Sequence, residues 1–297
     1  MTPRNWFILL LLGFVALACN QGQDIQKDIE RLEAKMETEN NAKDATTLSG
    51  LYQSYVDSHP EDHELNGRYL YRAAGLEYRM NNAAKALELT RVALKNHYAS
   101  SNTLNNAALM EKIYRENLGN PAIANTIAQA LKEVAPNTEA SSTPLPANLP
   151  PAMARLDTLR KNIFNNQTYG INFPVANNYV VAVESYVLVN PKHPQAPSLL
   201  FKAGEVARSI QTYSKALELL SWINDKYPES EENPQALFLK AFTLDDGLKQ
   251  FDEARAVYEE FIQKYPNDPF ADDAQFSLDN LGKDVNELIE NFDQQNQ

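Results

Sequence analysis

The segment Lys85-Ala86-Leu87-Glu88-Leu89 recurs unchanged as Lys215-Ala216-Leu217-Glu218-Leu219, at an offset of 130 positions (215 minus 85). At the same offset, Leu70-Tyr71-Arg72-Ala73-Ala74 matches Leu200-Phe201-Lys202-Ala203-Gly204. The pattern indicates that the chain consists of two related halves.

A shorter period of 38 positions lies inside each half. In the second half it links three features to their copies: Ala203 to Ala241, Ala216 to Ala254, and Lys226-Tyr227-Pro228 to Lys264-Tyr265-Pro266. A fixed period in this range is typical of an array of stacked helical hairpins. Such arrays form binding surfaces more often than catalytic centres.

The N-terminal residues resemble a secretory signal peptide. Arg4 is the only charge before the continuous apolar run Trp6–Leu17. This run is shorter than the roughly 20 residues that a permanent transmembrane helix needs, so it fits the apolar core of a cleaved signal. We therefore expect residues 1–18 to be removed after Ala18 and the protein to be exported.

Cys19, the only cysteine of the chain, directly follows that cleavage position, and it has no partner for an internal disulfide. The arrangement resembles the lipobox of bacterial lipoproteins, although Ala16 stands where Leu is usual and Leu17 is bulkier than usual. The resemblance implies that Cys19 is acylated; the alternative is ordinary signal cleavage beside an incidental cysteine. Because Asn20 is not the Asp of inner-membrane retention, we expect an outer-membrane lipoprotein facing the periplasm, with surface exposure left open.

The charge is strongly acidic and unevenly placed. The formal net charge is −12, and removing Arg4 with the signal makes it −13 (−12 − 1). From Glu229 to the end there are 17 acids and 5 bases. A nucleic-acid-binding protein needs a basic stripe, so we expect a protein partner, no nucleic acid, and contact with the membrane through the lipid anchor only.

The apolar periodicity predicts two helical lobes, at 19–136 and 151–293, joined by a Pro/Ser/Thr-rich linker at 137–150 and followed by a polar tail at 294–297. Predicted helices of the first lobe are 24–39, 42–58, 64–80, 82–97, 103–117 and 121–134. Those of the second are 152–165, 175–189, 197–209, 212–226, 233–246, 251–264, 269–281 and 284–292, with a long loop at 166–174.

Small residues recur where paired helices are expected to cross. Ala203 and Ala216 lie on the two helices of one predicted hairpin, and Ala241 and Ala254 repeat the pair. A bulkier residue would push the helix axes beyond about 8–10 Å. Ala203 and Ala216 are therefore expected to lie close together.

At 202–228, 240–266 and 71–94 the chain resembles the tetratricopeptide repeat (TPR) family, whose small residues match Ala203, Ala216 and their equivalents. The resemblance implies an all-α, TPR-like α-solenoid of antiparallel helical hairpins in two related lobes. The period is 38 rather than 34, and Leu200 or Phe238 replaces the family's Trp. The Lys-Tyr-Pro ending is similar to that of Gram-negative envelope TPR lipoproteins, including the one of the β-barrel assembly machinery.

No catalytic, cofactor-binding or metal-binding motif emerges. His59 and His63 bracket two acids, but Pro60 places them at a helix junction, where exposed turn residues are the simpler interpretation. The sequence has neither a Gly-rich phosphate loop nor a serine in a nucleophile elbow. We expect a protein that is not an enzyme and has no cofactor.

The resemblance implies a partner-binding groove lined by the first helix of each hairpin. The matching positions are Tyr71, Tyr78, Arg79, Phe201, Glu205 and Arg208; packing between the lobes is an alternative role for them. The leading hypothesis is a lipid-anchored scaffold or adaptor that binds another protein during envelope assembly or organisation. The alternative is a surface lipoprotein that captures a nutrient such as a glycan.

Overall fold

The computed structural model describes residues 24–39, 41–165 and 170–283. The chain falls into two compact units by backbone contacts. The first runs up to Leu149 and includes Leu188–Asn190; the second comprises Pro150–Val187 and the residues from Pro191 on. The predicted signal peptide, Cys19, the helix at 284–292 and the tail at 294–297 lie outside the described residues.

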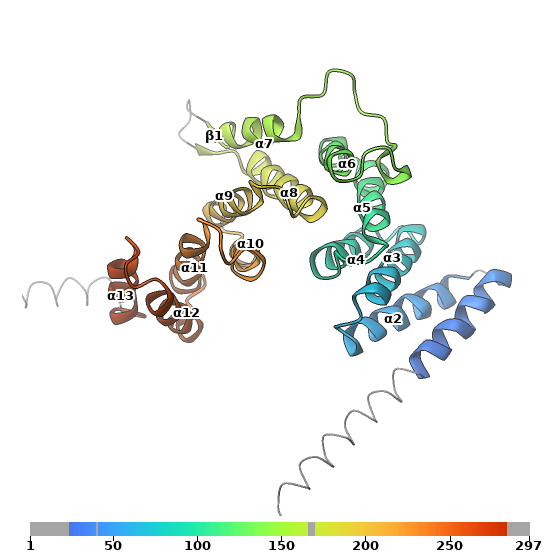
Figure 1. The fold of residues 1–297 in the computed structure, drawn as a ribbon, viewed down its shortest axis with the longest axis horizontal. Helices are drawn as coiled ribbons and strands as arrows, with labels where there is room; N and C mark the ends of the chain where they lie inside the picture. The colour runs from blue at the N-terminus through green and yellow to red at the C-terminus, as the bar shows by residue number, and fades with distance from the viewer. Residues whose placement is uncertain (1–23, 40, 166–169, 284–297) are drawn as a thin grey trace, which may run out of the picture. The chain divides into compact units, whose positions relative to one another are not determined.

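The first unit is a series of helices that pack on their neighbours in sequence order, α2 on α3, α3 on α4, α4 on α5 and α5 on α6 (Figure 1). An unlabelled helix at 24–38 comes first. It is followed by α2 (Ala42–Ser58), α3 (His63–Arg79), α4 (Ala83–Asn96), α5 (Thr103–Lys112), the π-helix η1 (Ile113–Asn117), α6 (Pro121–Val134) and the 3₁₀ helix η2 (Glu139–Ser141).

Side-chain caps begin four of these helices. Asn41, Asp62, Asn82 and Asn120 each accept a hydrogen bond from the backbone N–H of the third residue of the following helix. An acceptor there satisfies one of the N–H groups that lack a partner in the first turn. Pro121, at the first position of α6, follows Gly119, whose φ of +58° suits glycine.

The second unit has the same plan with one addition. Its elements are α7 (Ala152–Lys161), the strands β1 (Phe164–Asn165) and β2 (Gly170–Ile171), α8 (Phe173–Val189), α9 (Ala196–Ser209), α10 (Tyr213–Lys226), α11 (Asn233–Phe242), the π-helix η3 (Thr243–Gly247), α12 (Phe251–Lys264) and α13 (Ala271–Asp279). The strands pair antiparallel, with Phe164 opposite Ile171.

The repeat read from the sequence is confirmed by these bounds. Adding 130 to the bounds of α4, α5, η1 and α6 gives those of α10, α11, η3 and α12, and adding 131 to α2 gives α8. The backbone repeats as well, since Asn81 and Gln211 both have φ of 60°. The expected all-α, TPR-like array of hairpins in two related lobes is therefore correct.

Helix pairs meet through small side chains. Ala203 and Ala216 are both fully buried, and a Cβ built on Gly204 would lie 3.0 Å from Leu220 Cδ2 and 3.9 Å from the Ala216 carbonyl oxygen. The predicted proximity of α9 and α10 at this point is thus observed. A larger side chain at Ala216 would have no space without moving the helices apart.

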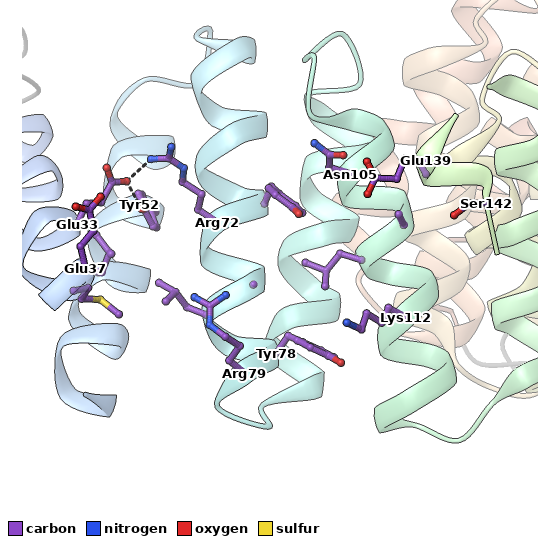
Figure 2. Close-up of a pocket in the computed structure, with 18 residues that line it drawn as sticks. Glu33, Glu37, Tyr52, Arg72, Tyr78, Arg79, Asn105, Lys112, Glu139 and Ser142 are labelled. Atoms are coloured by element: carbon purple, nitrogen blue, oxygen red, sulfur yellow. Dashed lines mark hydrogen bonds and ion pairs between the residues drawn. The ribbon is translucent and has the colours of Figure 1, made fainter. Parts of the chain in front are cut away.

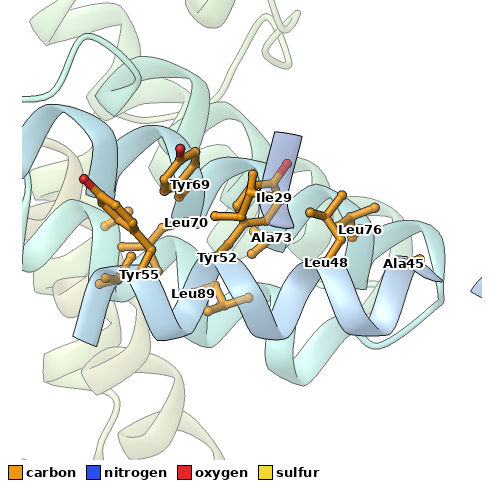
Figure 3. Close-up of a cluster of buried hydrophobic side chains, with 13 residues drawn as sticks. Ile29, Ala45, Leu48, Tyr52, Tyr55, Tyr69, Leu70, Ala73, Leu76 and Leu89 are labelled. Atoms are coloured by element: carbon orange, nitrogen blue, oxygen red, sulfur yellow. The ribbon is translucent and has the colours of Figure 1, made fainter. Parts of the chain in front are cut away.

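The core of the first unit is rich in tyrosine. Tyr52 stacks on Tyr69 with ring centroids 5.0 Å apart, and Tyr55 meets Tyr69 edge-on at 4.9 Å (Figure 3). Ile29, Leu48, Leu70 and Leu89 complete the cluster. In the second unit Leu237, Tyr258 and Phe261 belong to a core cluster built by α11, η3, α12 and α13. Burial of such side chains is the main favourable contribution to folding.

The structure corrects three predictions of local structure. The helix predicted at 152–165 ends at Lys161, because the poor helix formers Asn162, Ile163 and Phe164 follow and β1 begins. The loop predicted at 166–174 contains β2 and the first two residues of α8. The helices predicted at 103–117 and 233–246 end as π-helices, in which the Leu118 N–H donates to the Ile113 carbonyl and the Leu248 N–H to that of Thr243.

Within the described residues, no helix combines the length and the apolar character that crossing a membrane requires.

Candidate functional site

An open groove of about 1260 Å³ lies on the first unit (Figure 2). Four helices and the segment after α6 contribute its walls, and every lining residue belongs to this unit. The lining residues are Glu33, Met36, Glu37, Leu48, Tyr52, Tyr71, Arg72, Gly75, Leu76, Tyr78, Arg79, Asn105, Ala108, Leu109, Lys112, Glu139, Ala140 and Ser142.

One face of α3 supplies the centre of the groove. Tyr71, Gly75, Tyr78 and Arg79 follow one another at spacings of four, three and one, which places them on one side of the helix. The opposite side of α3 packs in the core with Ala73 and its neighbours. One face of α3 therefore packs in the core, and the opposite face lines the groove.

One end of the groove is formed by an ion pair that also covers the core. The Arg72 guanidinium and the Tyr52 hydroxyl both donate to Glu33 Oε1, as Figure 2 shows. Burial, followed by the hydrogen bond to Glu33, raises the pKa of Tyr52. These three groups satisfy one another and hold the helix at 24–38 against α3. Glu37 lines the groove at the same end.

The other end of the groove carries unpaired positive charge. Lys112 Nζ lies 5.1 Å from the centre of the Tyr78 ring, within the range of a cation–π interaction. The Tyr78 hydroxyl donates to Glu116, and this hydrogen bond raises the pKa of Tyr78. Neither Lys112 nor Arg79 forms an ion pair with an acid in the described part of the chain.

Gly75 leaves room for the Arg79 side chain. A Cβ built on Gly75 would lie 3.6 Å from Arg79 Nη1, an ordinary van der Waals separation. The guanidinium therefore extends over the glycine toward the groove, where Figure 2 shows both Arg79 and Tyr78. A side chain longer than alanine at position 75 would compete for this space.

The six predicted site residues divide between the two units. Tyr71, Tyr78 and Arg79 lie together in the groove. Phe201, Glu205 and Arg208 lie on one face of α9, in the second unit. Arg208 is engaged there, because its Nη2 lies 2.9 Å from Asp246 Oδ2 and its guanidinium 4.4 Å from the centre of the Phe242 ring. Partial desolvation of its carboxyl group raises the pKa of Glu205, although the side chain as a whole is exposed.

Small residues of the groove correspond to larger residues in the second unit. At the offset of 130, Gly75 corresponds to Glu205, Ala108 to Phe238 and Ala140 to Phe270. Phe238 and Phe270 stack on each other with centroids 5.0 Å apart. The face that is open in the first unit is thus occupied by aromatic side chains at the matching positions of the second.

Sequence reasoning missed the residues that give the groove its shape and charge. Gly75 and Lys112 were not singled out, and nor were Arg72 and Asn105. Gly75 was detectable, since it lies four residues after Tyr71 on the same helix face and differs from Glu205 at the repeat offset. Lys112 was not, because α5 packs beside α3 only in the folded structure.

The histidines do not form a metal site with other ligands. His63 Nδ1 lies 3.0 Å from His97 Nδ1, a contact that the sequence did not predict. Over residues 24–39, 41–165 and 170–283 the structure contains no group of three or more His, Cys, Asp or Glu side chains suited to a metal ion.

Comparison with known families supports the class of the fold. Residues 235–268 match the family model of the tetratricopeptide repeat. The match covers most of α11, η3 and α12, which lie in the second unit. No curated protein matches the chain. A TPR indicates a protein-interaction scaffold, a class in which the fold presents a surface to a partner.

Proposed function

We propose that the protein is a non-enzymatic scaffold of the cell envelope, held at the outer membrane by acylation of Cys19, and that the groove of its first unit binds a segment of another protein. The observation that carries the proposal is the groove, in which Tyr71, Tyr78 and Leu109 lie beside two cations, Arg79 and Lys112. Apolar walls with a few convergent polar groups are typical of binding sites.

The charge of the groove suggests the chemistry of the partner. Glu33 is ion-paired to Arg72, whereas Arg79 and Lys112 have no ion-paired acidic counterpart in the described part of the chain, although Glu37 and Glu139 also line the groove. A carboxylate on the partner would supply that counterpart, and apolar side chains beside it would cover Tyr71 and Leu109. We therefore infer a partner segment that combines an acidic residue with apolar neighbours.

The second unit has a different role in this proposal. Its matching face carries Phe238 and Phe270 in place of Ala108 and Ala140. Cores of stacked aromatic side chains stabilise an array and leave less space for a ligand. The second unit therefore supports the scaffold, and the groove of the first unit selects the partner.

Site-specific photocrosslinking tests the proposal with a matched pair of positions. Asn105 lines the groove and is exposed; Gln235, at the offset of 130, is exposed on α11. A photoreactive phenylalanine analogue at 105 should capture one defined protein from membranes, and the same analogue at 235 should not. Equal yields at the two positions, or none at 105, would overturn the assignment of the groove.

Nutrient capture is the alternative function, and it requires a protein that faces outward. Protease treatment of intact cells should leave the protein intact if it works in the periplasm as we propose. Removal by protease, together with the absence of a crosslinked protein at Asn105, would support the alternative.

A further inference from the structure

The β1–β2 hairpin is a feature of the second unit alone among the described residues. In the first unit the helix at 24–38 leads to α2 within a few residues. In the second unit α7 ends at Lys161, and the two strands intervene before α8. Because α2 and α8 are otherwise equivalent, the hairpin is an insertion that the packing of the array does not require.

The hairpin exposes two large aromatic side chains. Phe164 on β1 is 59% exposed and Phe173, the first residue of α8, is 58% exposed. They are the two most exposed large hydrophobic residues in the part of the chain that the structure describes. Ile163, beside Phe164, is buried, so one side of β1 packs inward while the other faces solvent. Phe164 pairs with Ile171 across the hairpin, and Phe173 follows Ile171 by two residues, so both exposed aromatic side chains belong to the hairpin and its exit into α8.

The charge around the hairpin is the reverse of that of the chain. The formal net charge of the protein is −12, yet Thr158–Val183 contains no acid and two bases, Arg160 and Lys161. Both bases lie within 4 Å of the same carboxylate, Asp157, with separations of 3.5 Å and 2.6 Å. Two cations on one carboxylate leave a positive charge at the end of α7, directly before β1; Glu205 also lies within electrostatic range of Arg160.

We propose that this patch, formed by Phe164, Phe173, Arg160 and Lys161, docks on an anionic phospholipid surface. Aromatic side chains favour the boundary between headgroups and acyl chains, and bases beside them attract anionic headgroups. The patch would add a second membrane contact to the lipid anchor proposed at Cys19, and combined contacts bind more tightly than either alone. The membrane contact thus extends beyond the anchor that sequence analysis alone identified.

A single-cysteine label tests the contact directly. Cys19 is the only cysteine, so the full chain carrying Cys19→Ser accepts one new labelling site. Pro174→Cys places an environment-sensitive NBD fluorophore beside Phe173. Gln275→Cys places it beside Phe276, which is 50% exposed on the acidic helix α13 and serves as a matched control.

Adding vesicles of phosphatidylcholine and phosphatidylglycerol should brighten and blue-shift NBD at 174 but not at 275. Phe164→Ser with Phe173→Ser should abolish the change, and Arg160→Gln with Lys161→Gln should reduce the apparent vesicle affinity by about thirtyfold, since each of the two bases near such a surface contributes roughly 1 kcal/mol. An equal change at both labels, or none at 174, would overturn the proposal. Sedimentation without vesicles provides a second check. If the parent self-associated and the Phe164→Ser, Phe173→Ser protein did not, the patch would bind a second copy of the chain and the proposal would be overturned.

Discussion

Lys112 places its ammonium group 5.1 Å from the centre of the Tyr78 ring. The equivalent pair of the second unit has the partners exchanged, with the Arg208 guanidinium 4.4 Å over the Phe242 ring. In both units an acid 38 positions after the first residue completes the contact, Glu116 for Tyr78 and Asp246 for Arg208. In both lobes a cation thus contacts an aromatic ring between the first helices of two successive hairpins. In the first lobe the cation belongs to the later helix, and in the second lobe it belongs to the earlier helix.

Because of this exchange, the cation of this contact is ion-paired in the second unit but not in the first. Arg208 is ion-paired to Asp246, whereas Lys112 lies against Tyr78 and has no ion-paired acid among the described residues. Lys112→Gln should therefore weaken partner binding about fivefold, because a cation near a ring and an incoming carboxylate contributes roughly 1 kcal/mol. Titration of each variant with the purified partner, once crosslinking at Asn105 has identified it, measures this change in affinity. Lys226→Gln, at the exposed end of α10, is the control and should bind like the parent; the same loss in both proteins would refute a specific role for Lys112.

Two glycines in mid-helix should respond to alanine with opposite signs. A Cβ at Gly67 would lie 2.3 Å from Ser100 Cβ, whereas nothing lies within 4 Å of a Cβ at Gly50. Gly67→Ala should destabilise the first unit by about 1–3 kcal/mol through overpacking. Gly50→Ala should stabilise it by roughly 0.5–1 kcal/mol, because alanine is the better helix former.

Urea unfolding followed by circular dichroism, with hydrogen exchange in α3, measures both changes. Adding Ser100→Gly to the Gly67→Ala protein should restore part of the lost stability, since it removes the atom that clashes. If Gly67→Ala unfolded at the parent's urea concentration, the close approach of α3 to the turn after α4 would be wrong.

The fold should be sensitive to alkaline pH. Burial raises the pKa of Tyr55, Tyr179 and Tyr258 from 10.0 to about 12. In the unfolded chain these hydroxyls ionise first, so the stability that they contribute is complete below pH 10 and is lost as the pH rises toward 12. Each pKa unit corresponds to about 1.4 kcal/mol.

Far-UV circular dichroism and tyrosinate absorbance, recorded together against pH, check this prediction. Helix loss and tyrosine ionisation should coincide. Tyr179→Phe removes one ionisable group at a fully buried position and should extend the stability of the second unit to higher pH. Tyrosine ionisation near pH 10 with the helices intact would contradict the burial of these side chains.

Cys19→Ser tests the lipid anchor, which rests on sequence alone. The variant should move from the membrane fraction to the soluble fraction and lose incorporation of a labelled fatty acid, because its anchor is the acyl chain. The fatty-acid label is the decisive measurement. Membrane retention with unchanged labelling would show that Cys19 is not acylated, and retention without labelling would point to the hairpin patch.

Most of the architecture could be predicted from the sequence, because the residues that pack between helices recur at the same offsets in successive repeats. The bounds of α2 and α6 follow from periodicity, Asn or Pro at the start and His-Pro or Ala-Pro at the end, and Tyr-Pro marks the end of α12. The π-helices η1 and η3 were not predictable, since one extra residue per turn leaves no mark in apolar spacing over five residues.

The groove was predictable only in part. Tyr71, Tyr78 and Arg79 on its α3 face were predicted through the resemblance to the TPR family, whose groove positions they match. Lys112 and Glu33 come from other helices, and their approach to α3 depends on how successive hairpins pack. The contrast between Gly75 and Glu205 was visible at the repeat offset, but its meaning required the 3.6 Å separation from Arg79 Nη1.

The central claim is that the groove of the first unit, and not its filled counterpart, binds the partner. Gly75→Glu transplants the residue of the second unit, fills the space over the glycine and pairs with Arg79 one turn later. The affinity of the partner captured at Asn105, measured by calorimetry, should fall by at least about tenfold. The free energy of unfolding, measured in urea, should change by no more than about 0.5 kcal/mol, as for an ordinary surface substitution. An unchanged affinity in a folded Gly75→Glu protein would contradict the account.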